Sequence, residues 1–128
     1  MSAGELILVV EDNELNLKLV RDVLQFAGFE VMEARTGEEG VERAAERRPD
    51  LVLMDLQLPG IDGAEAMRRL RACSPTRHVP VVAVTAFAMR EDRERALGAG
   101  FDGYVEKPFS PRELPAQVRA FLRGVPHG

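Results

Sequence analysis

The sequence predicts an α/β protein built on a single doubly wound, five-stranded parallel sheet. Short apolar runs that suit buried strands alternate five times with segments of helical periodicity. The connections are short, so parallel strands with right-handed helical crossovers on both faces are the expected solution. The clearest strand signals are the continuous aliphatic runs at 6–10, 51–55 and 79–84, which are typical of strands buried on both faces.

The first strand-helix unit lies at the N-terminus. The strand at 6–10 is followed by Glu11 to Glu14, which places acidic side chains where a helix begins. A helix is expected over 14–27, and Gly28 is expected to end it as a C-terminal cap. We assign its core face to Asn16, Leu19, Val20, Val23, Leu24 and Ala27.

The same unit repeats along the chain. A strand at 30–34 leads to a helix over 37–47, capped by Thr36 with Glu39 at the capping-box position three residues later. The other strands are expected at 51–55, 79–84 and 102–106, and the other helices at 64–72, at 88–97 and from Ser110-Pro111 to about Arg123.

Length and composition indicate one globular domain. A chain of 128 residues can bury a sizeable core, so we expect a single domain over 1–128, with its core at about 5–123 and no effector domain. No apolar run approaches the roughly 20 residues that span a bilayer, and the N-terminus does not resemble a signal peptide. With one cysteine, Cys73, these features predict a cytoplasmic protein. The net charge of −4 and interleaved Arg and Glu disfavour autonomous nucleic-acid binding.

Polar side chains end four of the predicted strands. Glu11 and Asp12 follow the first strand, Asp55 ends the third, Thr85 follows the fourth and Lys107 the fifth. Because parallel strands share one carboxyl-terminal edge, and binding sites in such sheets form there, we expect these five groups to meet. Each of them alone is also explained as a helix cap, a solvated acid or a surface ion pair.

Three acids in that set indicate a cation. Carboxylates about 4 Å apart repel one another by roughly 4 kcal/mol per pair at an effective dielectric constant of 20. Oxygen ligands without histidine or thiolate favour Mg²⁺ over zinc. Lys107, one of only two lysines among 17 basic residues, would add a compact positive charge, and Thr85 a hydroxyl donor.

Four segments resemble the receiver domain of two-component response regulators. They are Glu11-Asp12, LVLMDLQLPGIDG at 51–63, VVAVTA at 81–86 and YVEKPF at 104–109, in the family's order and spacing. This resemblance implies a CheY-like, flavodoxin-like (βα)5 fold with strand order 2-1-3-4-5. The stretches VEDNELNLKLV and VPVVAVTAFAM are more particularly similar to stand-alone cell-division regulators of the DivK type.

The resemblance also implies a role for each acid. Asp55 would be the phosphoacceptor, phosphorylated by a sensor histidine kinase or a histidine phosphotransfer protein. Mg²⁺ would be held by Glu11, Asp12, Asp55 and the backbone carbonyl of Gln57, one of the first two acids acting through water. The family more often has Asp at the position of Glu11, so the resemblance favours contact of Glu11 with Mg²⁺ through water over a direct bond.

The remaining residues would form a switch. Thr85 and Lys107 would contact the phosphoryl oxygens, Tyr104 would follow Thr85, and the bond before Pro108 would be cis. The face made by the fourth helix, fifth strand and fifth helix would then change shape for a downstream protein, or the phosphoryl group would be relayed. The implied protein is a signalling phosphoacceptor rather than an enzyme, with self-phosphorylation and slow autodephosphorylation, and is a monomer or a weak phosphorylation-dependent dimer.

Three alternatives stay open at this stage. One is a receiver excised from a hybrid histidine kinase. A haloacid-dehalogenase-like phosphatase also uses an aspartyl phosphate, but it needs a second acid where this chain has Gln57. A flavodoxin-like cofactor protein needs a phosphate-binding loop after the first strand, where this chain has Glu11-Asp12-Asn13-Glu14.

Two further signals need interpretation. The segment at 98–103 matches G-x-G-x-x-G, but it follows a helix and precedes a strand, so we interpret it as a helix cap and a tight turn. Leu15 and Leu17 lie about 200° apart on a helical wheel and cannot both be central to the core. With Phe87 and Met89 they predict either packing at the core edge or a docking surface for a kinase or phosphotransfer helix bundle.

Overall fold

The computed structural model describes residues 4–56, 60–61, 63–85, 98, 100–106 and 110–123. The predicted helix over 88–97 and the predicted functional residues Gln57, Phe87, Met89, Lys107 and Pro108 lie outside these residues. The elements are β1 (Leu6–Val10), α1 (Glu14–Phe26), β2 (Glu30–Ala34), α2 (Gly37–Glu46), β3 (Leu51–Asp55), α3 (Gly63–Ala72), the 3-10 turn η1 (Ser74–Thr76), β4 (Val81–Thr85), β5 (Gly103–Glu106) and α5 (Leu114–Leu122).

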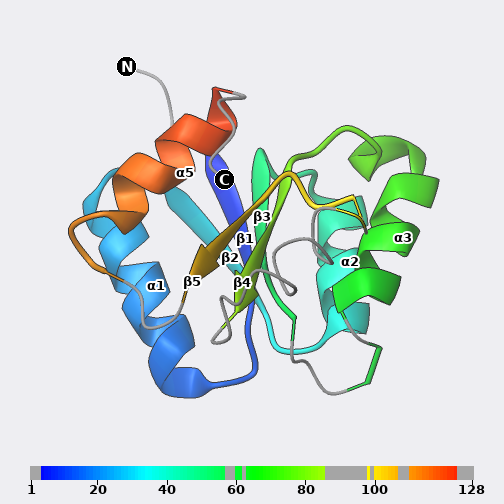
Figure 1. The fold of residues 1–128 in the computed structure, drawn as a ribbon, viewed down its shortest axis with the longest axis horizontal. Coiled ribbons are helices and arrows are strands. Elements are labelled where there is room, and N and C mark those ends of the chain that lie inside the picture. Colours follow the sequence, from blue (N-terminus) through cyan, green and yellow to red (C-terminus); the bar gives the residue numbers. More distant parts are fainter. Residues whose placement is uncertain are drawn as a thin grey trace.

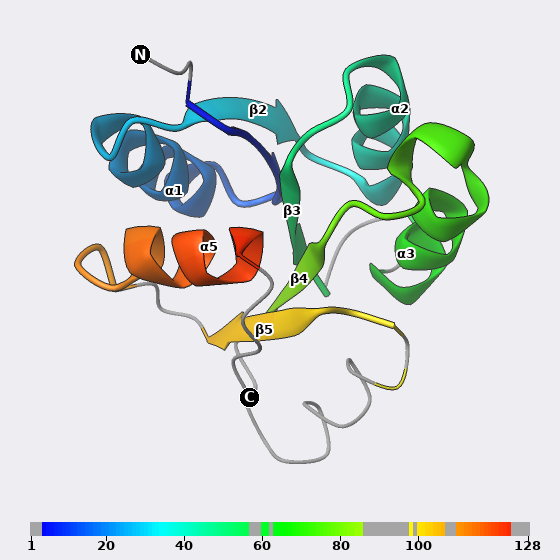
Figure 2. The same ribbon diagram turned by 90° about the horizontal axis from the view of Figure 1, so that it is seen from above.

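The five strands form one parallel sheet in the order β2-β1-β3-β4-β5, which confirms the predicted fold class and strand order. The order reverses between β1 and β3, because β2 pairs on one side of β1 and β3 on the other. Helices α1 and α5 therefore cover one face of the sheet, and α2 and α3 cover the other (Figures 1 and 2).

The central strands contribute to a hydrophobic core on each face of the sheet. Successive side chains of a strand point to opposite faces, so Ile7 and Val9 of β1 pack under α1 and α5, while Leu8 and Val10 pack under α2 and α3. All five residues of β1, β3 and β4 are buried. This explains why these strands are continuous apolar runs in the sequence.

Local capping fixes where α1 and α2 begin. Asn13 caps α1, and its Oδ1 accepts a hydrogen bond from the Asn16 N–H at 3.0 Å. At α2, the Glu39 N–H donates to Thr36 Oγ1 at 3.0 Å, and the Glu39 carboxylate accepts from the Arg35 N–H at 3.1 Å. The predicted cap is therefore confirmed, although the acid reaches the residue before the cap instead of the cap itself.

The predicted core face of α1 is confirmed at Val20 and Leu24 but is wrong at Leu19. The buried residues of the helix are Leu17, Val20 and Leu24, whereas Leu19 is 37% exposed. Leu15 is 80% exposed, in agreement with the expectation that Leu15 and Leu17 could not both be central. The helix is rotated so that its Leu17 side faces the sheet and α5, and the sequence pattern alone does not distinguish these neighbouring faces.

Helix α5 begins later than Ser110-Pro111 suggested. The Leu114 N–H donates to the Ser110 carbonyl at 2.9 Å, which closes a turn. Pro115 has no N–H to continue the ladder to the carbonyl of residue 111, so the regular helix starts at Leu114. Its hydrogen bonding resumes with the Gln117 N–H, which donates to the Glu113 carbonyl at 3.0 Å.

The described turn at Gly100 fits the interpretation of the G-x-G-x-x-G segment. Gly100 has φ +101, a conformation that glycine adopts without strain, and it stands just before β5. Gly103 lies within β5, where a Cβ atom would be 2.2 Å from the ring of Phe121.

In the described part of the chain, the helices are too short or too polar to cross a membrane.

Candidate functional site

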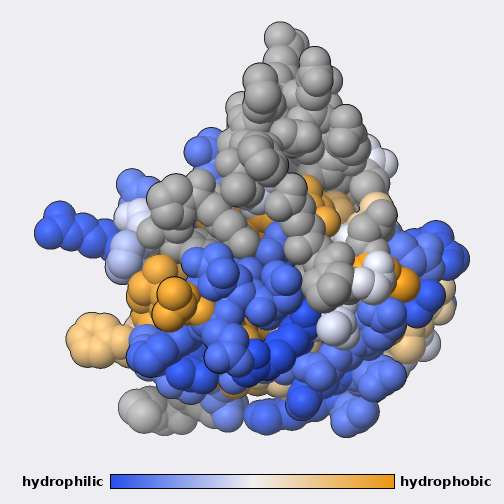
Figure 3. All heavy atoms as spheres, turned by 90° about the horizontal axis from the view of Figure 1, so that it is seen from below, coloured by the Kyte–Doolittle hydropathy of each residue, from blue (hydrophilic) through white to orange (hydrophobic). Residues whose placement is uncertain are grey.

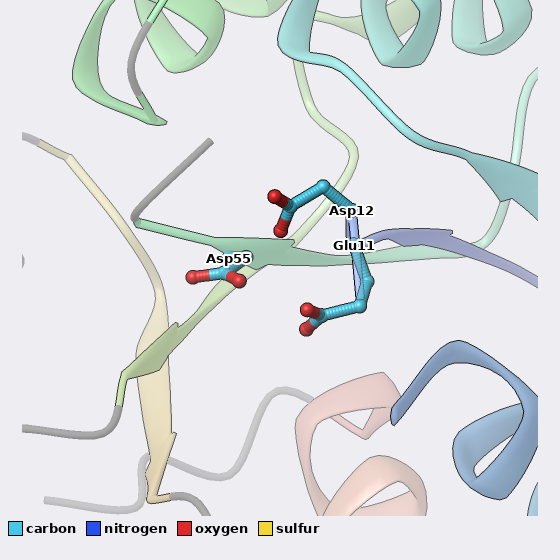
Figure 4. A group of neighbouring side chains, drawn as sticks. All are labelled: Glu11, Asp12 and Asp55. Atoms are coloured by element: carbon cyan, nitrogen blue, oxygen red, sulfur yellow. The ribbon is translucent and has the colours of Figure 1, made fainter. Parts of the chain in front are cut away.

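Three acidic side chains meet where β1 and β3 end. Glu11 and Asp12 directly follow β1, and Asp55 is the last residue of β3. The two strands are neighbours, with Val10 opposite Met54, so the residues that follow lie side by side. One carboxylate oxygen from each of the three lies within 4.8 Å of the others (Figure 4). We call Glu11, Asp12 and Asp55 the acidic triad.

The acidic triad combines buried and accessible groups. Glu11 is 2% exposed and Asp55 is 4% exposed, whereas Asp12 is exposed to solvent. The Glu11 N–H donates to the Ala34 carbonyl at 2.9 Å, which extends the pairing of β1 with β2 by one residue. The Glu11 carboxylate accepts from the Asn13 N–H at 3.2 Å. Backbone pairing thus fixes Glu11, and Asp12 lies where an ion from solvent could reach it.

The donor set suits a hard divalent cation. The three groups offer carboxylate oxygens, and the group contains neither histidine nor cysteine. Mg²⁺ and Ca²⁺ prefer such ligands, and Mg²⁺ is commonly held by one or two carboxylates with water completing its shell. Two largely buried carboxylates beside a third repel one another, and a cation would offset that cost. The residues present therefore fit a magnesium ion.

Thr85 lies on β4, the strand next to that of Asp55, and Tyr104 lies on β5, one strand further. Asp55 is opposite Val84 in the β3–β4 register, so Thr85 is one residue beyond it at the same edge of the sheet, and it is 7% exposed. Tyr104 is opposite Ala83 in the β4–β5 register and packs, partly buried, against the core under α2 and α3. Lys107 follows the last residue of β5 in the sequence, but it is not among the described residues.

The structure also shows two contacts between distant segments that sequence reasoning missed. Arg35, before α2, donates a hydrogen bond to the carboxylate of Glu14 in the first turn of α1. Glu38, in the first turn of α2, accepts a hydrogen bond from the Ile61 N–H at 3.3 Å, which ties α2 to the connection after Asp55. The partners are 21 and 23 residues apart, and no local sequence pattern connects them.

Among the described residues, few large apolar side chains are exposed. Viewed toward the edge where the strands end, the described residues are mostly hydrophilic (Figure 3). The large hydrophobic side chains that are exposed among the described residues, Leu15, Leu19 and Phe26, all belong to α1. Leu15 stands in the first turn of this helix, three residues after Asp12. It is the leucine of the predicted docking pair that is accessible, since Leu17 is buried.

Comparison with known proteins agrees with this geometry. The sequence profile of the response regulator receiver domain matches residues 7–119. The chain is 44% identical over 116 residues to the polar-differentiation response regulator DivK of Brucella anthropi, covering 91% of this chain and 94% of that protein. The DivK of Brucella ovis is 43% identical over the same shares of both chains. The resemblance to DivK-type regulators is therefore confirmed.

Solved structures give the same result. The receiver domain of the sensor histidine kinase PA1611 from Pseudomonas aeruginosa, solved with a magnesium ion in its active site cleft, superposes with a TM-score of 0.87 at 39% identity, covering 94% of this chain and 99% of that one. The chemotaxis response regulator CheY4 of Vibrio cholerae gives a TM-score of 0.86 at 28% identity, covering 91% and 97%. From its strand order, its sequence profile and these relatives, the chain belongs to the response regulator receiver domain family.

Proposed function

We propose that this chain is a phosphorylated signalling protein in which Asp55 accepts a phosphoryl group from a phosphohistidine. The donor would be a sensor histidine kinase or a histidine phosphotransfer protein of a two-component system. The observation that carries the proposal is the acidic triad, with one oxygen of each carboxylate within 4.8 Å of the others at the end of β1 and β3. The DivK relatives, which are named response regulators, support the same activity.

Mg²⁺ is the cofactor that this proposal requires. Glu11, Asp12 and Asp55 would hold it, together with the backbone carbonyl of Gln57, as sequence resemblance implies. When bound, the ion would neutralise the charge that develops on the acceptor and on the transferred phosphoryl group. The magnesium in the active site cleft of the PA1611 receiver supports this assignment.

The protein groups would act mainly by placement and electrostatics. A carboxylate oxygen of Asp55 forms the new O–P bond while the P–N bond of the donor breaks, and the electron pair of that bond stays on the donor imidazole. The negative charge on the transferred phosphoryl oxygens would be stabilised by the hydroxyl of Thr85 and the ammonium of Lys107. Later attack by water on the acyl phosphate gives slow autodephosphorylation.

Phosphorylation would then bias a two-state switch. It replaces the single negative charge of Asp55 with nearly two, and the three added oxygens attract hydrogen-bond donors. Thr85 would move toward the phosphoryl group, and Tyr104, on the adjacent strand, would fill the space that it leaves. The face formed by the predicted fourth helix, β5 and α5 would carry the signal to a protein partner.

We propose that phosphorylation and the switch both belong to a single receiver domain with its core at about 5–123.

The direct test is phosphorylation by a small-molecule donor. Full-length protein treated with acetyl phosphate and Mg²⁺ should gain the mass of one phosphoryl group, measured by intact mass spectrometry. The Asp55→Asn variant, and wild-type protein with the metal chelated, should gain none. A folded wild-type protein that is never labelled, or an Asp55→Asn variant that is labelled equally, would refute the assignment.

A second candidate has one observation in its favour. The PA1611 receiver belongs to a sensor histidine kinase and covers 94% of this chain, so a receiver module of a hybrid kinase is compatible with the same fold and site. The chemistry at Asp55 would be unchanged, but the output would be phosphoryl relay to a phosphotransfer protein. Transfer of the label from phosphorylated protein to a purified phosphotransfer domain would favour this second role.

A further inference from the structure

Helix α1 carries a second apolar stripe, which the fold does not bury. Leu15 is 80% exposed, Leu19 is 37% exposed and Phe26 is 96% exposed. At about 100° per residue these three side chains lie within about 40° of one another around the helix, and roughly 150° from its buried residues. We call Leu15, Leu19 and Phe26 the apolar stripe of α1. Packing of a single chain leaves this stripe in contact with water.

A groove opens beside one end of the apolar stripe, between α1 and the turn that leads into α5. The two helices lie side by side on one face of the sheet (Figures 1 and 2). The groove has a volume of about 390 Å³ and is lined by Asp22, Val23, Phe26, Ala27, Pro111 and Pro115. Most of this lining is apolar, and the groove is large enough for a leucine side chain. The same face therefore has a projecting leucine at one end and an apolar groove at the other.

The charges beside the apolar stripe match a second copy of the same face. Lys18 and Asp22 flank the stripe on one side, with side chains that are 64% and 50% exposed. The midpoint of Lys18 and Asp22 is position 20, and the midpoint of Leu15 and Phe26 lies between positions 20 and 21. If two antiparallel copies of α1 meet across a twofold axis at this point, Lys18 of each copy faces Asp22 of the other. The same register places Leu15 of each copy against Phe26 and the groove of the other.

We propose that this face of α1 is a self-association surface, on which two copies of the chain pair α1 against α1 in antiparallel orientation. The contact is isologous, because each copy contributes the same stripe, the same groove and both charges. It covers only about three turns of one helix, so we expect it to bury less than the roughly 1,200 Å² of a stable complex. The dimer should accordingly be weak, and half formed at about 50 to 500 µM protein.

This association goes beyond the proposed function, because it does not require phosphorylation of Asp55. It also has a consequence for the docking contact predicted at Leu15. A second copy seated on the apolar stripe covers Leu15, which is otherwise 80% exposed. A phosphohistidine donor that docks on Leu15 would therefore compete with self-association.

The apolar part of the contact is tested with an exposed residue. Sedimentation equilibrium of the unphosphorylated full-length protein, from about 10 µM to about 1 mM, measures the association constant. Phe26→Ser removes the apolar side chain without disturbing the core, because Phe26 is 96% exposed. We expect it to weaken association by at least about tenfold. Glu42→Gln, at an exposed position on α2, is the control and should associate as wild type does.

Two charge reversals test the antiparallel register. In a dimer of Lys18→Glu, each introduced carboxylate faces Asp22 of the other copy. In a dimer of Asp22→Lys, each introduced ammonium faces Lys18 of the other copy. We expect each variant alone to associate about fivefold more weakly than wild type. An equimolar mixture of the two restores opposite charges at both positions and should return to within about twofold of wild type.

The mixture separates contacts between copies from effects inside one helix. Lys18 and Asp22 also pair within α1 at 2.6 Å, and mixing cannot repair that pair in either variant. A mixture that associates no better than its two components would therefore overturn the antiparallel pairing. Circular dichroism should show that every variant is folded.

Three further results would overturn the self-association surface itself. They are a wild-type protein that stays monomeric at about 1 mM, a Phe26→Ser variant that associates as wild type does, and association that appears only after treatment with acetyl phosphate. None of these results would bear on the phosphorylation of Asp55, which is measured separately by intact mass. The two proposals can therefore fail independently.

Discussion

At the scale of single residues, the acidic triad brings three carboxylates together in a largely buried place. Glu11 and Asp55 are almost fully buried, and their carboxylates lie within 4.8 Å of each other and of Asp12. Amide or apolar side chains at these positions would avoid the repulsion that charged oxygens meet in a poorly solvated site. The Mg²⁺ proposed for this site would offset that repulsion.

Thr85 and Tyr104 offer a clean test of the proposed switch, because Tyr104 is the only tyrosine and the chain has no tryptophan. We expect phosphorylation to shift the NMR signals of the Tyr104 ring in wild-type protein. Thr85→Ala lacks the hydroxyl that would follow the phosphoryl group, so the shift should fall to less than about half. Thr85→Ser keeps the hydroxyl and should retain most of it.

Both Thr85 variants should still be labelled at Asp55 by acetyl phosphate, which confirms that the site is intact. Because Thr85 is 7% exposed, thermal unfolding must show that each variant is folded at the temperature of the experiment. A full Tyr104 shift in phosphorylated Thr85→Ala would disconnect the two residues and remove Thr85 from the switch.

At the scale of elements, α1 has a buried side and an exposed side. Its buried line of Leu17, Val20 and Leu24 joins the core under α5, while Leu15 projects from its first turn near the acidic triad. An apolar side chain that is 80% exposed adds nothing to the core. Its exposure, three residues after Asp12 in the sequence, favours the predicted contact with a phosphohistidine donor.

Leu15→Asp tests this contact without disturbing the core. We expect phosphotransfer from a cognate donor protein to fall about tenfold, because a charge would replace an apolar anchor in the interface. Labelling by acetyl phosphate, which needs no docking surface, should be unchanged. Leu17→Asp is unsuitable, because it would bury a carboxylate in the core and unfold the protein. Undiminished transfer to a folded Leu15→Asp protein would rule out this part of α1 as the docking surface.

Helix α3 carries a pH-dependent ion pair. Hydrogen bonds from Arg68 and Arg69 lower the pKa of Glu65 from 4.5 to about 2. The ionised form is therefore favoured in the folded protein, so its contribution is complete above about pH 4.5 and is lost as the pH falls toward 2. Since all three side chains are solvent-accessible, the contribution is small.

We accordingly expect Glu65→Gln to lower Tm slightly at pH 6, with a difference that closes between about pH 4.5 and 2. Thermal unfolding of both proteins across this range checks the sign. High salt should shrink the difference at pH 6, because it screens exposed charges. A difference that grows on acidification would contradict the assignment.

At the scale of the whole molecule, the sequence predicted the sheet and the acidic triad for the same reason. Buried parallel strands are local apolar runs, and the residues that end them must share an edge, so Glu11, Asp12 and Asp55 could be placed together without coordinates. The side of α1 that faces the core was less predictable. The leucines of α1 fit more than one helical face, and only packing against α5 selects Leu17 over Leu19.

Contacts between distant segments were beyond sequence reasoning. The hydrogen bond between Glu38 and Ile61 joins residues that are 23 positions apart, so it depends on how α2 packs against the connection after Asp55. Neither residue belongs to a sequence motif that predicts this contact. The late start of α5 was in principle readable, because Pro115 cannot donate to the carbonyl of residue 111. The prediction relied instead on Ser110-Pro111, which is typical of a helix start.

The stability of the whole domain should report the charge state of the acidic triad. Without a divalent ion the three carboxylates repel one another, and Asp12 is exposed, so Asp12→Asn relieves repulsion with little loss of packing. We expect metal-free Asp12→Asn to unfold at a higher temperature than wild type. With Mg²⁺ at about 100 times its Kd, wild type should gain about 2.7 kcal/mol, or roughly 10 °C in Tm, and the variant much less.

Without Mg²⁺ the Asp12→Asn variant should be the more stable protein, whereas Mg²⁺ should stabilise wild type more than the variant, and this contrast separates a metal site from general screening. Scans at constant ionic strength, with KCl replacing MgCl2, should leave wild type near its metal-free Tm. Glu42→Gln, which loses a charge from an exposed position on α2, should respond to Mg²⁺ as wild type does. If Asp12→Asn lowered the metal-free Tm, or gained as much from Mg²⁺ as wild type, the acidic triad would not be the ion-binding site.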